Sequence, residues 1–199
     1  GMSPCTRVPN VQPTFVLGDG TEWAPRNDSK KKVGEMVTLR WALSQSNNWI
    51  SAYLIREFSP QSLVKLMHSF GIKSKLDPVV SLCLGPVEVS VSEMVDAYTT
   101  FVNKGIKVEP LYVTRIEDNK GNIISTFTPQ YTEIISEETS HKMLEMLKAV
   151  INEGTGVRLR YRYQFKGDIG GKTGTTQNNS DGWFIGVTPE LVSGTWVGG

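Results

Sequence analysis

The sequence predicts an α+β fold in which helices pack on an antiparallel sheet formed by the end of the chain. Apolar residues recur at helical spacing in several segments between positions 38 and 151. Two runs typical of strands, 183–187 and 191–197, follow on either side of the turn signal Thr188-Pro189-Glu190. The 199 residues, 39% of them hydrophobic and 21% charged, are enough to bury a sizeable core.

Charge balance and the scarcity of metal-ligating residues exclude several classes of function. The 21 basic and 20 acidic residues nearly cancel, so nothing in the composition indicates a nucleic-acid partner. His68 and His141 have no cysteine or acidic partner at metal-ligand spacing, so we expect no metal and no cofactor. Cys5 and Cys83 could be free thiols or a disulfide. No apolar run reaches the ~20 residues of a membrane span.

Residues 1–32 are predicted to be an extended loop region, and residues 33–199 the folded domain. The first region has little hydrophobic periodicity and contains four prolines: Pro4, Pro9, Pro13 and Pro25. Its basic run Lys30-Lys31-Lys32 is expected at a solvated tip.

Two predicted helices meet at a polar corner. Thr38 can cap the first, and apolar residues continue at helical spacing on both sides of Ser44-Gln45-Ser46-Asn47-Asn48. These apolar positions are Leu39, Leu43, Ile50, Leu54, Ile55 and Phe58. Ser46 and Asn48 are therefore expected where one helix ends and the next begins. Taken alone, both residues could be ordinary helix caps.

Three further helices are predicted after this corner. One occupies 60–70, and Gly71 ends it. Its inward-facing residues are expected to be Leu63, Leu66 and Met67. Ser90-Val91-Ser92-Glu93 forms a capping box for the second. The third begins at Ser136 and stops at Gly154-Thr155-Gly156.

Two segments have strand-like patterns before the end of the chain. Runs 108–116 and 122–127 flank Asp118-Asn119-Lys120-Gly121, which is a hairpin signal. Between positions 157 and 165, apolar and aromatic residues alternate with three arginines. Basic residues interleaved with aromatics occur in modules that bind single-stranded nucleic acid. With balanced overall charge, the pattern instead indicates a strand or extended loop with its arginines pointing outward.

The stretch Gly170-Gly171-Lys172-Thr173-Gly174-Thr175-Thr176 is suited to an anion. Lysine supplies a compact cation, threonine a hydroxyl donor, and glycine lets a ligand approach the backbone. A phosphate-binding P-loop would need glycine where Lys166 stands, and a helix afterwards. Instead, Gln177-Asn178-Asn179-Ser180 is loop-like and precedes a strand, so the nucleotide hypothesis is disfavoured.

This stretch and the single Ser46-Asn47-Asn48 triplet resemble the K-T-G and S-x-N boxes of the penicillin-recognising acyl-serine enzymes. Trp23-Ala24-Pro25-Arg26-Asn27 is similar to an aromatic-x-Pro-x-Asn loop of class A, bifunctional penicillin-binding proteins. Other strings, at 34–48, 84–108, 152–156 and 181–198, extend the resemblance to the end. It implies their β-lactamase-like transpeptidase fold, with residues 33–199 as a partial domain truncated at both ends.

The resemblance also implies a role for each residue of the two boxes. Ser46 would relay a proton, Asn48 would hold the substrate amide, and Lys172 would supply positive potential. Thr173, Gly174 and Thr175 would form the substrate site. There the two threonines would bind the terminal carboxylate of a D-alanyl-D-alanine stem peptide or of a β-lactam. The Thr175 N–H would be one oxyanion donor.

The nucleophile box of the family, S-x-x-K, precedes S-x-N. Ser29-Lys30-Lys31-Lys32 lies where the family has no nucleophile, and Ser62-Leu63-Val64-Lys65 follows S-x-N, so neither string is assigned. We therefore expect an excised C-terminal part of a D,D-transpeptidase that cross-links peptidoglycan through an acyl-serine intermediate. This part would be inactive by itself.

The implied parent protein has a glycosyltransferase domain and a membrane anchor outside this chain, with the present domain extracytoplasmic, in the periplasm or at the cell surface. Its expected partners are peptidoglycan stem peptides and β-lactams. An alternative is a non-catalytic module that binds peptidoglycan or β-lactams, favoured if no S-x-x-K box precedes residue 1. A serine β-lactamase-like hydrolase is less favoured, because no extra acid is positioned to activate a deacylating water.

Overall fold

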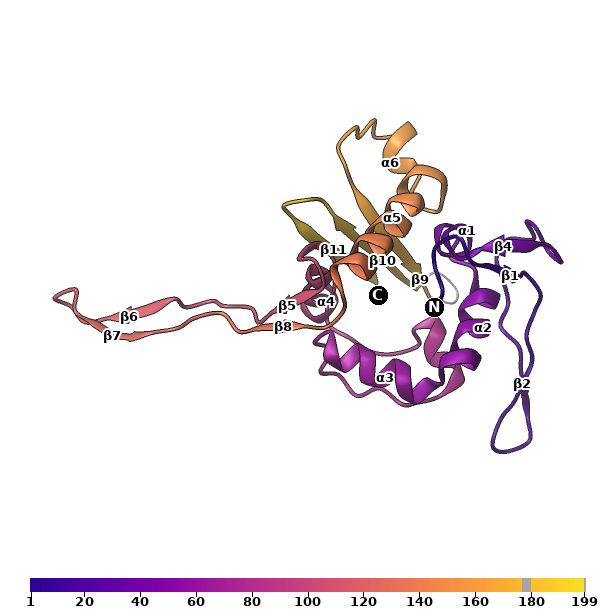
Figure 1. Cartoon of the computed structure of the whole chain (residues 1–199), viewed down its shortest axis with the longest axis horizontal. Helices are drawn as coiled ribbons and strands as arrows, with labels where there is room; N and C mark the ends of the chain where they lie inside the picture. The colour runs from indigo at the N-terminus through magenta and orange to yellow at the C-terminus, as the bar shows by residue number, and fades with distance from the viewer. Residues whose placement is uncertain (177–179, 199) are drawn as a thin grey trace.

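The structure is a computed structural model that describes residues 1–176 and 180–198, and it confirms the predicted α+β class (Figure 1). The largest sheet of the described residues is antiparallel, in the order β11-β10-β9. Its strands are β9 (Gly170–Thr175), β10 (Asp181–Val187) and β11 (Val192–Gly198). Both predicted C-terminal strands are present, and the K-T-G segment adds the third. The predicted loop Gln177-Asn178-Asn179-Ser180 falls, apart from Ser180, outside the described residues.

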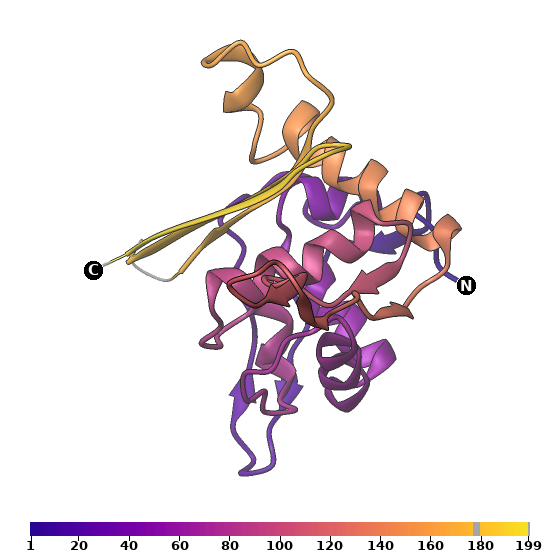
Figure 2. The ribbon, with the colours of Figure 1, turned by 90° about the vertical axis from the view of Figure 1, so that its left-hand side faces the viewer.

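Two helices cover one face of this sheet. α5 (Glu137–Glu153) begins after its predicted cap Ser136 and packs against β9, while α4 (Val91–Val102) packs against β11. The innermost residues of α5 are completely buried: Leu147, Val150 and Ile151. Figure 2 shows the sheet nearly edge-on with both helices on the same side. Neither these nor the other helices in the described ranges combine the length and apolar character needed to cross a bilayer.

Two helices meet at the predicted polar corner. α1 (Leu39–Ser44) is capped by Thr38, whose side chain accepts a hydrogen bond from the Trp41 N–H. α2 (Asn48–Phe58) begins immediately after Asn47. Both helices bury apolar residues in one core cluster, which also contains Val8 and Val37. The corner between the helices therefore packs on this core.

α3 (Pro60–Ser69) occupies the predicted range but packs less deeply than its pattern suggests. Leu63 and Met67 contact the core, whereas Leu66 is 46% exposed. The prediction that Leu66 faces the core is wrong, because this residue lines an open apolar pocket of about 490 Å³. The 3₁₀ helix η1 (Val80–Leu84) follows, and no periodic pattern in the sequence predicts it.

The structure adds short strands to the extended region predicted over residues 1–32. β1 (Arg7–Pro9) pairs with β4 (Met36–Thr38), and β2 (Phe15–Val16) pairs with β3 (Glu22–Trp23). Strands of two or three residues are too short to show an alternating pattern, so periodicity could not detect them.

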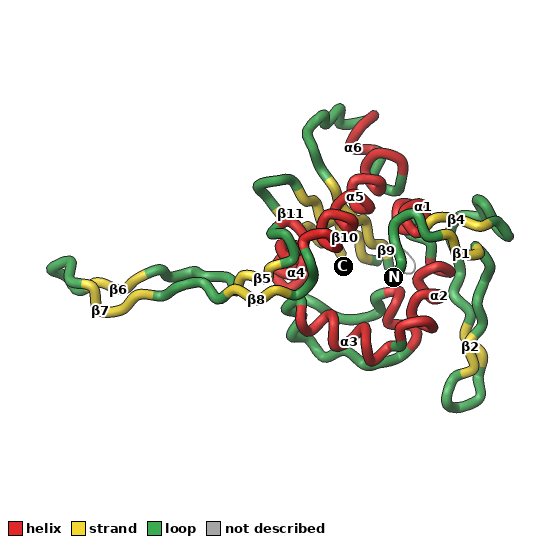
Figure 3. The backbone as a smooth tube through the Cα atoms, in the orientation of Figure 1, coloured by secondary structure: helices red, strands yellow, loops and turns green. Residues whose placement is uncertain are grey.

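A long two-stranded arm projects from the body of the molecule (Figure 3). Its base pairs β5 (Ile106–Val108) with β8 (Tyr131–Glu133), and its outer part pairs β6 (Arg115–Glu117) with β7 (Ile123–Thr126). The turn of the hairpin lies at the predicted position, 118–121, although the ladder on either side is shorter than the predicted runs.

The segment after α5 differs from the prediction. α6 (Arg158–Tyr161) is a short helix where a strand or extended loop over 157–165 is predicted, so that prediction is wrong for the first half of the segment. Local hydrogen bonds explain the difference. The Arg160 guanidinium turns back and donates to the carbonyls of Phe165 and Gly167, which stabilises a compact turn in place of an extended strand.

Candidate functional site

Ser46 lies at the end of α1 in a backbone conformation that favours glycine. Its φ is +52°, in the left-handed region. The Ser46 N–H donates to the Leu43 carbonyl at 3.0 Å and the Asn47 N–H to the Ala42 carbonyl at 2.9 Å, which is the Schellman pattern of a helix end. The side chain of Ser46 is exposed. Strained conformations of this kind cluster at functional sites, so Ser46 is a candidate functional residue.

Lys172 reaches this serine from β9. Its Nζ donates to Ser46 Oγ at 2.8 Å and to the Thr173 carbonyl at 2.8 Å. Burial of the ammonium lowers the pKa of Lys172 to about 8. The group is therefore still mostly charged at neutral pH. The Ser46 hydroxyl is thus in contact with solvent, and the Lys172 ammonium hydrogen-bonded to it could replace the proton if Ser46 gave it up.

The two asparagines after Ser46 play different structural parts. The side chain of Asn47 caps α2, and its Nδ2 donates to Asn10 Oδ1 at 2.9 Å. Asn48 is the first residue of α2, and its Nδ2 donates to the Arg26 carbonyl at 2.7 Å. The capping residue is therefore Asn47, not Ser46 or Asn48. The bond to Arg26 uses one of the two amide protons of Asn48.

A third segment, Gly154-Thr155-Gly156, joins the corner to β9 and belongs to neither of the two boxes. The Thr155 N–H donates to the Ser44 carbonyl at 3.0 Å, and Thr155 Oγ1 lies 2.6 Å from Thr173 Oγ1. A Cβ atom at Gly154 would lie 2.1 Å from the Ser44 carbonyl oxygen, so this close approach requires glycine. The Gly-Thr-Gly string is visible in the sequence, but by itself it indicates only the end of a helix.

The other K-T-G residues lie along β9. Thr173 is partly buried, and Thr175 is exposed at the end of the strand. Gly174 pairs with Trp183 of β10, where a Cβ atom would lie 3.1 Å from the Cβ of that tryptophan. This close approach to Trp183 gives a packing reason for glycine at position 174, whereas access for a ligand stays a prediction. The structure places Ser46, Lys172 and Thr173 in one hydrogen-bonded cluster.

No hydrogen bond joins either S-x-x-K string to this cluster in the described part of the chain. Ser62 lies in the first turn of α3, where its N–H and its hydroxyl both bond to Ser59 Oγ. Ser29 accepts a hydrogen bond from the Lys31 N–H within an exposed loop. The hydrogen-bond partners of both serines are therefore local.

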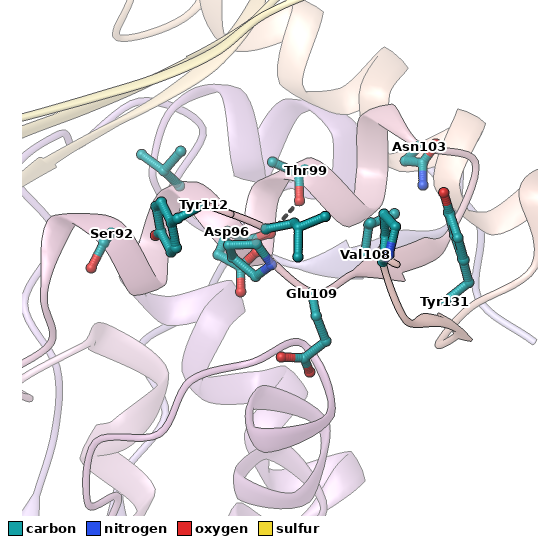
Figure 4. Close-up of a pocket in the computed structure, with 12 residues that line it drawn as sticks. Ser92, Asp96, Thr99, Asn103, Val108, Glu109, Tyr112 and Tyr131 are labelled. Carbon is teal, nitrogen blue, oxygen red and sulfur yellow. Dashed lines mark hydrogen bonds between the residues drawn. The ribbon is translucent and has the colours of Figure 1, made fainter. Parts of the chain in front are cut away.

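A separate pocket of about 650 Å³ lies at the base of the arm, between α4 and the strands β5 and β8 (Figure 4). Asp96 and Thr99 of α4 line it together with Tyr112 and Tyr131 of the arm. The Thr99 hydroxyl donates to the Asp96 carbonyl of the same helix. None of the predicted site residues lines this pocket, so its volume does not identify the chemistry.

Comparisons with known proteins give a family for the chain. Residues 11–197 match the family model described as penicillin binding protein transpeptidase domain. Penicillin-binding protein 1A of Aquifex aeolicus is 33% identical over 187 residues, which cover 94% of this chain and 25% of that protein. Penicillin-binding protein 2D of Bacillus subtilis is 30% identical over 204 residues, which cover 100% of this chain and 29% of that protein. The chain thus spans less than a third of the length of either relative.

Solved structures share the fold. Penicillin-binding protein 1A from Haemophilus influenzae has a TM-score of 0.88 at 24% identity, covering 100% of this chain and 35% of that one. Penicillin-binding protein A from M. tuberculosis, solved as an imipenem acyl-enzyme complex, has a TM-score of 0.82 at 19% identity, covering 100% and 50%. These similarities confirm the predicted fold family.

Proposed function

The chain belongs to the penicillin-binding protein transpeptidase domain family, and on this premise we propose that it supplies the proton-transfer and carboxylate-binding groups of a serine D,D-transpeptidase. The longer protein would cross-link peptidoglycan stem peptides through an acyl-serine intermediate. The observation that supports this most directly is the 2.8 Å hydrogen bond from Lys172 Nζ to Ser46 Oγ. This hydrogen bond joins the S-x-N and K-T-G boxes, and the proposed mechanism needs both boxes in one place.

Ser46 is proposed to give a proton to the leaving nitrogen. An ammonium group can only donate, so the Ser46 oxygen accepts from Lys172 and its own hydrogen is free to point to the substrate. When the substrate C–N bond breaks, the nitrogen takes the Ser46 proton and Lys172 replaces it. A pKa of about 8 makes Lys172 a better proton donor than an ordinary lysine.

Thr173 and Thr175 are proposed to donate hydrogen bonds to the terminal carboxylate of a D-alanyl-D-alanine stem peptide or of a β-lactam. The partly buried Lys172 ammonium adds positive potential to that site. Asn48 holds the substrate amide, Gly174 leaves the backbone open to the ligand, and the Thr175 N–H is one oxyanion donor.

The nucleophile is proposed to come from a segment outside residues 1–199, since both S-x-x-K serines have other partners. Without that segment the chain would bind ligands but form no acyl bond. Two solved structures of the same fold support β-lactams as ligands. One is the imipenem acyl-enzyme complex of penicillin-binding protein A, and the other is the PonA1 protein from Mycobacterium tuberculosis in complex with penicillin V, with a TM-score of 0.82. We further propose that the longer protein is membrane-anchored outside this chain, has a glycosyltransferase domain, and holds the present domain extracytoplasmic.

A fluorescent penicillin tests these proposals. The chain and the full-length protein that contains it are each incubated with the reagent, and adducts are resolved on a gel and by mass spectrometry. We expect an adduct on the full-length protein only. Ser46→Ala in that protein should slow acylation about 100-fold, as for loss of a general acid. The exposed Ser69→Ala is the matched control and should have no effect.

Two outcomes would change the assignment. A stoichiometric adduct on the chain alone would show that a serine within it is the nucleophile. Absence of an adduct on the full-length protein, together with saturable binding of the same penicillin, would support the non-catalytic binding module.

A further inference from the structure

We propose that Thr155 is a positioning residue of the carboxylate site: when a carboxylate is bound, the Thr155 hydroxyl donates to Thr173 Oγ1 and thereby directs the Thr173 proton to the ligand. This inference rests on the proposed function of the K-T-G segment. Thr155 belongs to neither sequence box and is assigned no contact with ligand. It acts through Thr173, whose oxygen lies 2.6 Å from its own.

Three backbone hydrogen bonds, to two carbonyl groups, hold the Thr155 backbone in place. The flanking Gly154 and Gly156 N–H groups both donate to the Val150 carbonyl of α5, at 3.2 and 3.0 Å. The Thr155 N–H donates to the Ser44 carbonyl at 3.0 Å. The backbone of Thr155 is therefore fixed relative to both α5 and the end of α1. From this position the side chain brings its hydroxyl within hydrogen-bond distance of Thr173.

Counting protons gives the direction of the hydrogen bond. Each threonine hydroxyl has one proton, and a carboxylate can only accept. If Thr173 donates to a carboxylate, its proton is used, and the bond between the two hydroxyls must then run from Thr155 to Thr173. Such a chain of donors polarises each member, so the bond from Thr173 to the anion becomes stronger.

The opposite direction makes the opposite prediction. If Thr173 donated to Thr155, its proton would be unavailable to the ligand, and removal of the Thr155 hydroxyl would strengthen carboxylate binding. Thr155→Val removes the hydroxyl and leaves the backbone bond to Ser44 in place, whereas Thr155→Ser keeps the hydroxyl. The two variants therefore separate the hydroxyl from the fold.

The experiment compares two ligands on three proteins. The chain and its Thr155→Val and Thr155→Ser variants are titrated by NMR with an acylated peptide ending in D-alanyl-D-alanine, as the free carboxylate and as the C-terminal amide. We expect Thr155→Val to raise the Kd of the carboxylate roughly three- to tenfold, the value of one hydrogen bond, and to leave the Kd of the amide unchanged. Thr155→Ser should retain the wild-type Kd for both, and unfolding temperatures should match.

Other results would overturn the inference. An unchanged or lower carboxylate Kd in Thr155→Val would show that Thr173 does not depend on Thr155 for its direction. An equal rise for carboxylate and amide would show a merely structural role. If the wild-type chain binds the free carboxylate no more tightly than the C-terminal amide, the proposed carboxylate site itself is wrong, whatever the variants do.

Discussion

Ser46 and Lys172 are 126 positions apart in the sequence, yet Lys172 Nζ lies 2.8 Å from Ser46 Oγ. The serine has left-handed backbone angles at the end of a right-handed helix. The lysine lies on a strand, where burial lowers the pKa of its ammonium group to about 8. Both residues are thus held in states that their side chains alone would not favour. Such states persist where the surrounding fold imposes them, which is common at functional sites.

Ser46→Gly should make the protein more stable and less active. Glycine adopts the left-handed conformation without strain, so the free energy of unfolding should rise by about 1 kcal/mol. The hydroxyl is lost, so acylation of the full-length protein by fluorescent penicillin should slow as in Ser46→Ala. Urea denaturation measures the first effect. A less stable glycine variant would mean that the hydrogen bond from Lys172 outweighs the strain.

Binding of the carboxylate peptide should weaken as the pH rises through about 8, because Lys172 then loses its charge. Kd measured between pH 7 and 9 should increase several-fold. Lys172→Met is the control, and should bind weakly with little pH dependence over the same range. A flat profile for the wild-type chain would mean that the ammonium does not contribute to binding.

The same pKa predicts a change in stability. Folding lowers the pKa of Lys172 from its ordinary value of 10.5 to about 8, so the unfolded chain holds this proton more tightly. The free energy of unfolding should therefore gain a contribution from Lys172 as the pH rises from about 8 towards 10.5. Comparison with Lys172→Met in urea denaturation isolates this contribution, which should be absent from the variant.

Gly154→Ala should separate the corner of α1 from the strand β9. Its Cβ would lie 2.1 Å from the Ser44 carbonyl oxygen, which is part of the backbone and cannot rotate away. We expect a loss of about 1–3 kcal/mol in stability and a loss of penicillin reactivity in the full-length protein. Gly18→Ala, where a Cβ would meet nothing within 4 Å, is the matched control. Equal stability of the two variants would contradict the proposed close contact.

Glu93→Gln should remove part of the acid resistance of the fold. Hydrogen bonds from the backbone of Ser90, and then of Ser74 and Lys73, lower the pKa of Glu93 to about 2. The stabilisation from this carboxylate is present above its ordinary pKa of 4.5 and is lost as the pH falls towards 2. Between pH 5 and 2, the free energy of unfolding should fall more steeply with decreasing pH for wild type than for the variant. The exposed Glu88→Gln should behave like wild type.

The helices could be predicted because their signals are local. Thr38, Ser90 and Ser136 cap the helices that follow them, and each cap is within four residues of its partner. The two boxes of the site were also visible, because each is a short string. Their contact could be predicted only through the family resemblance. The contact between Thr155 and Thr173 could not be predicted, because no periodic pattern connects their two segments. The helix α6 could not be predicted either, because the alternation of apolar and basic residues gives no sign of the hydrogen bonds that Arg160 makes.

The projecting arm should unfold locally before the body of the molecule does. Tyr112 is 89% exposed and Ile124 is 67% exposed, so the outer arm is held mainly by its own ladder. Its amide protons should therefore exchange with solvent long before those of α5, and a protease should cut near its turn first. Because the arm has no residue in the cluster around Ser46, a chain nicked there should keep its ligand site.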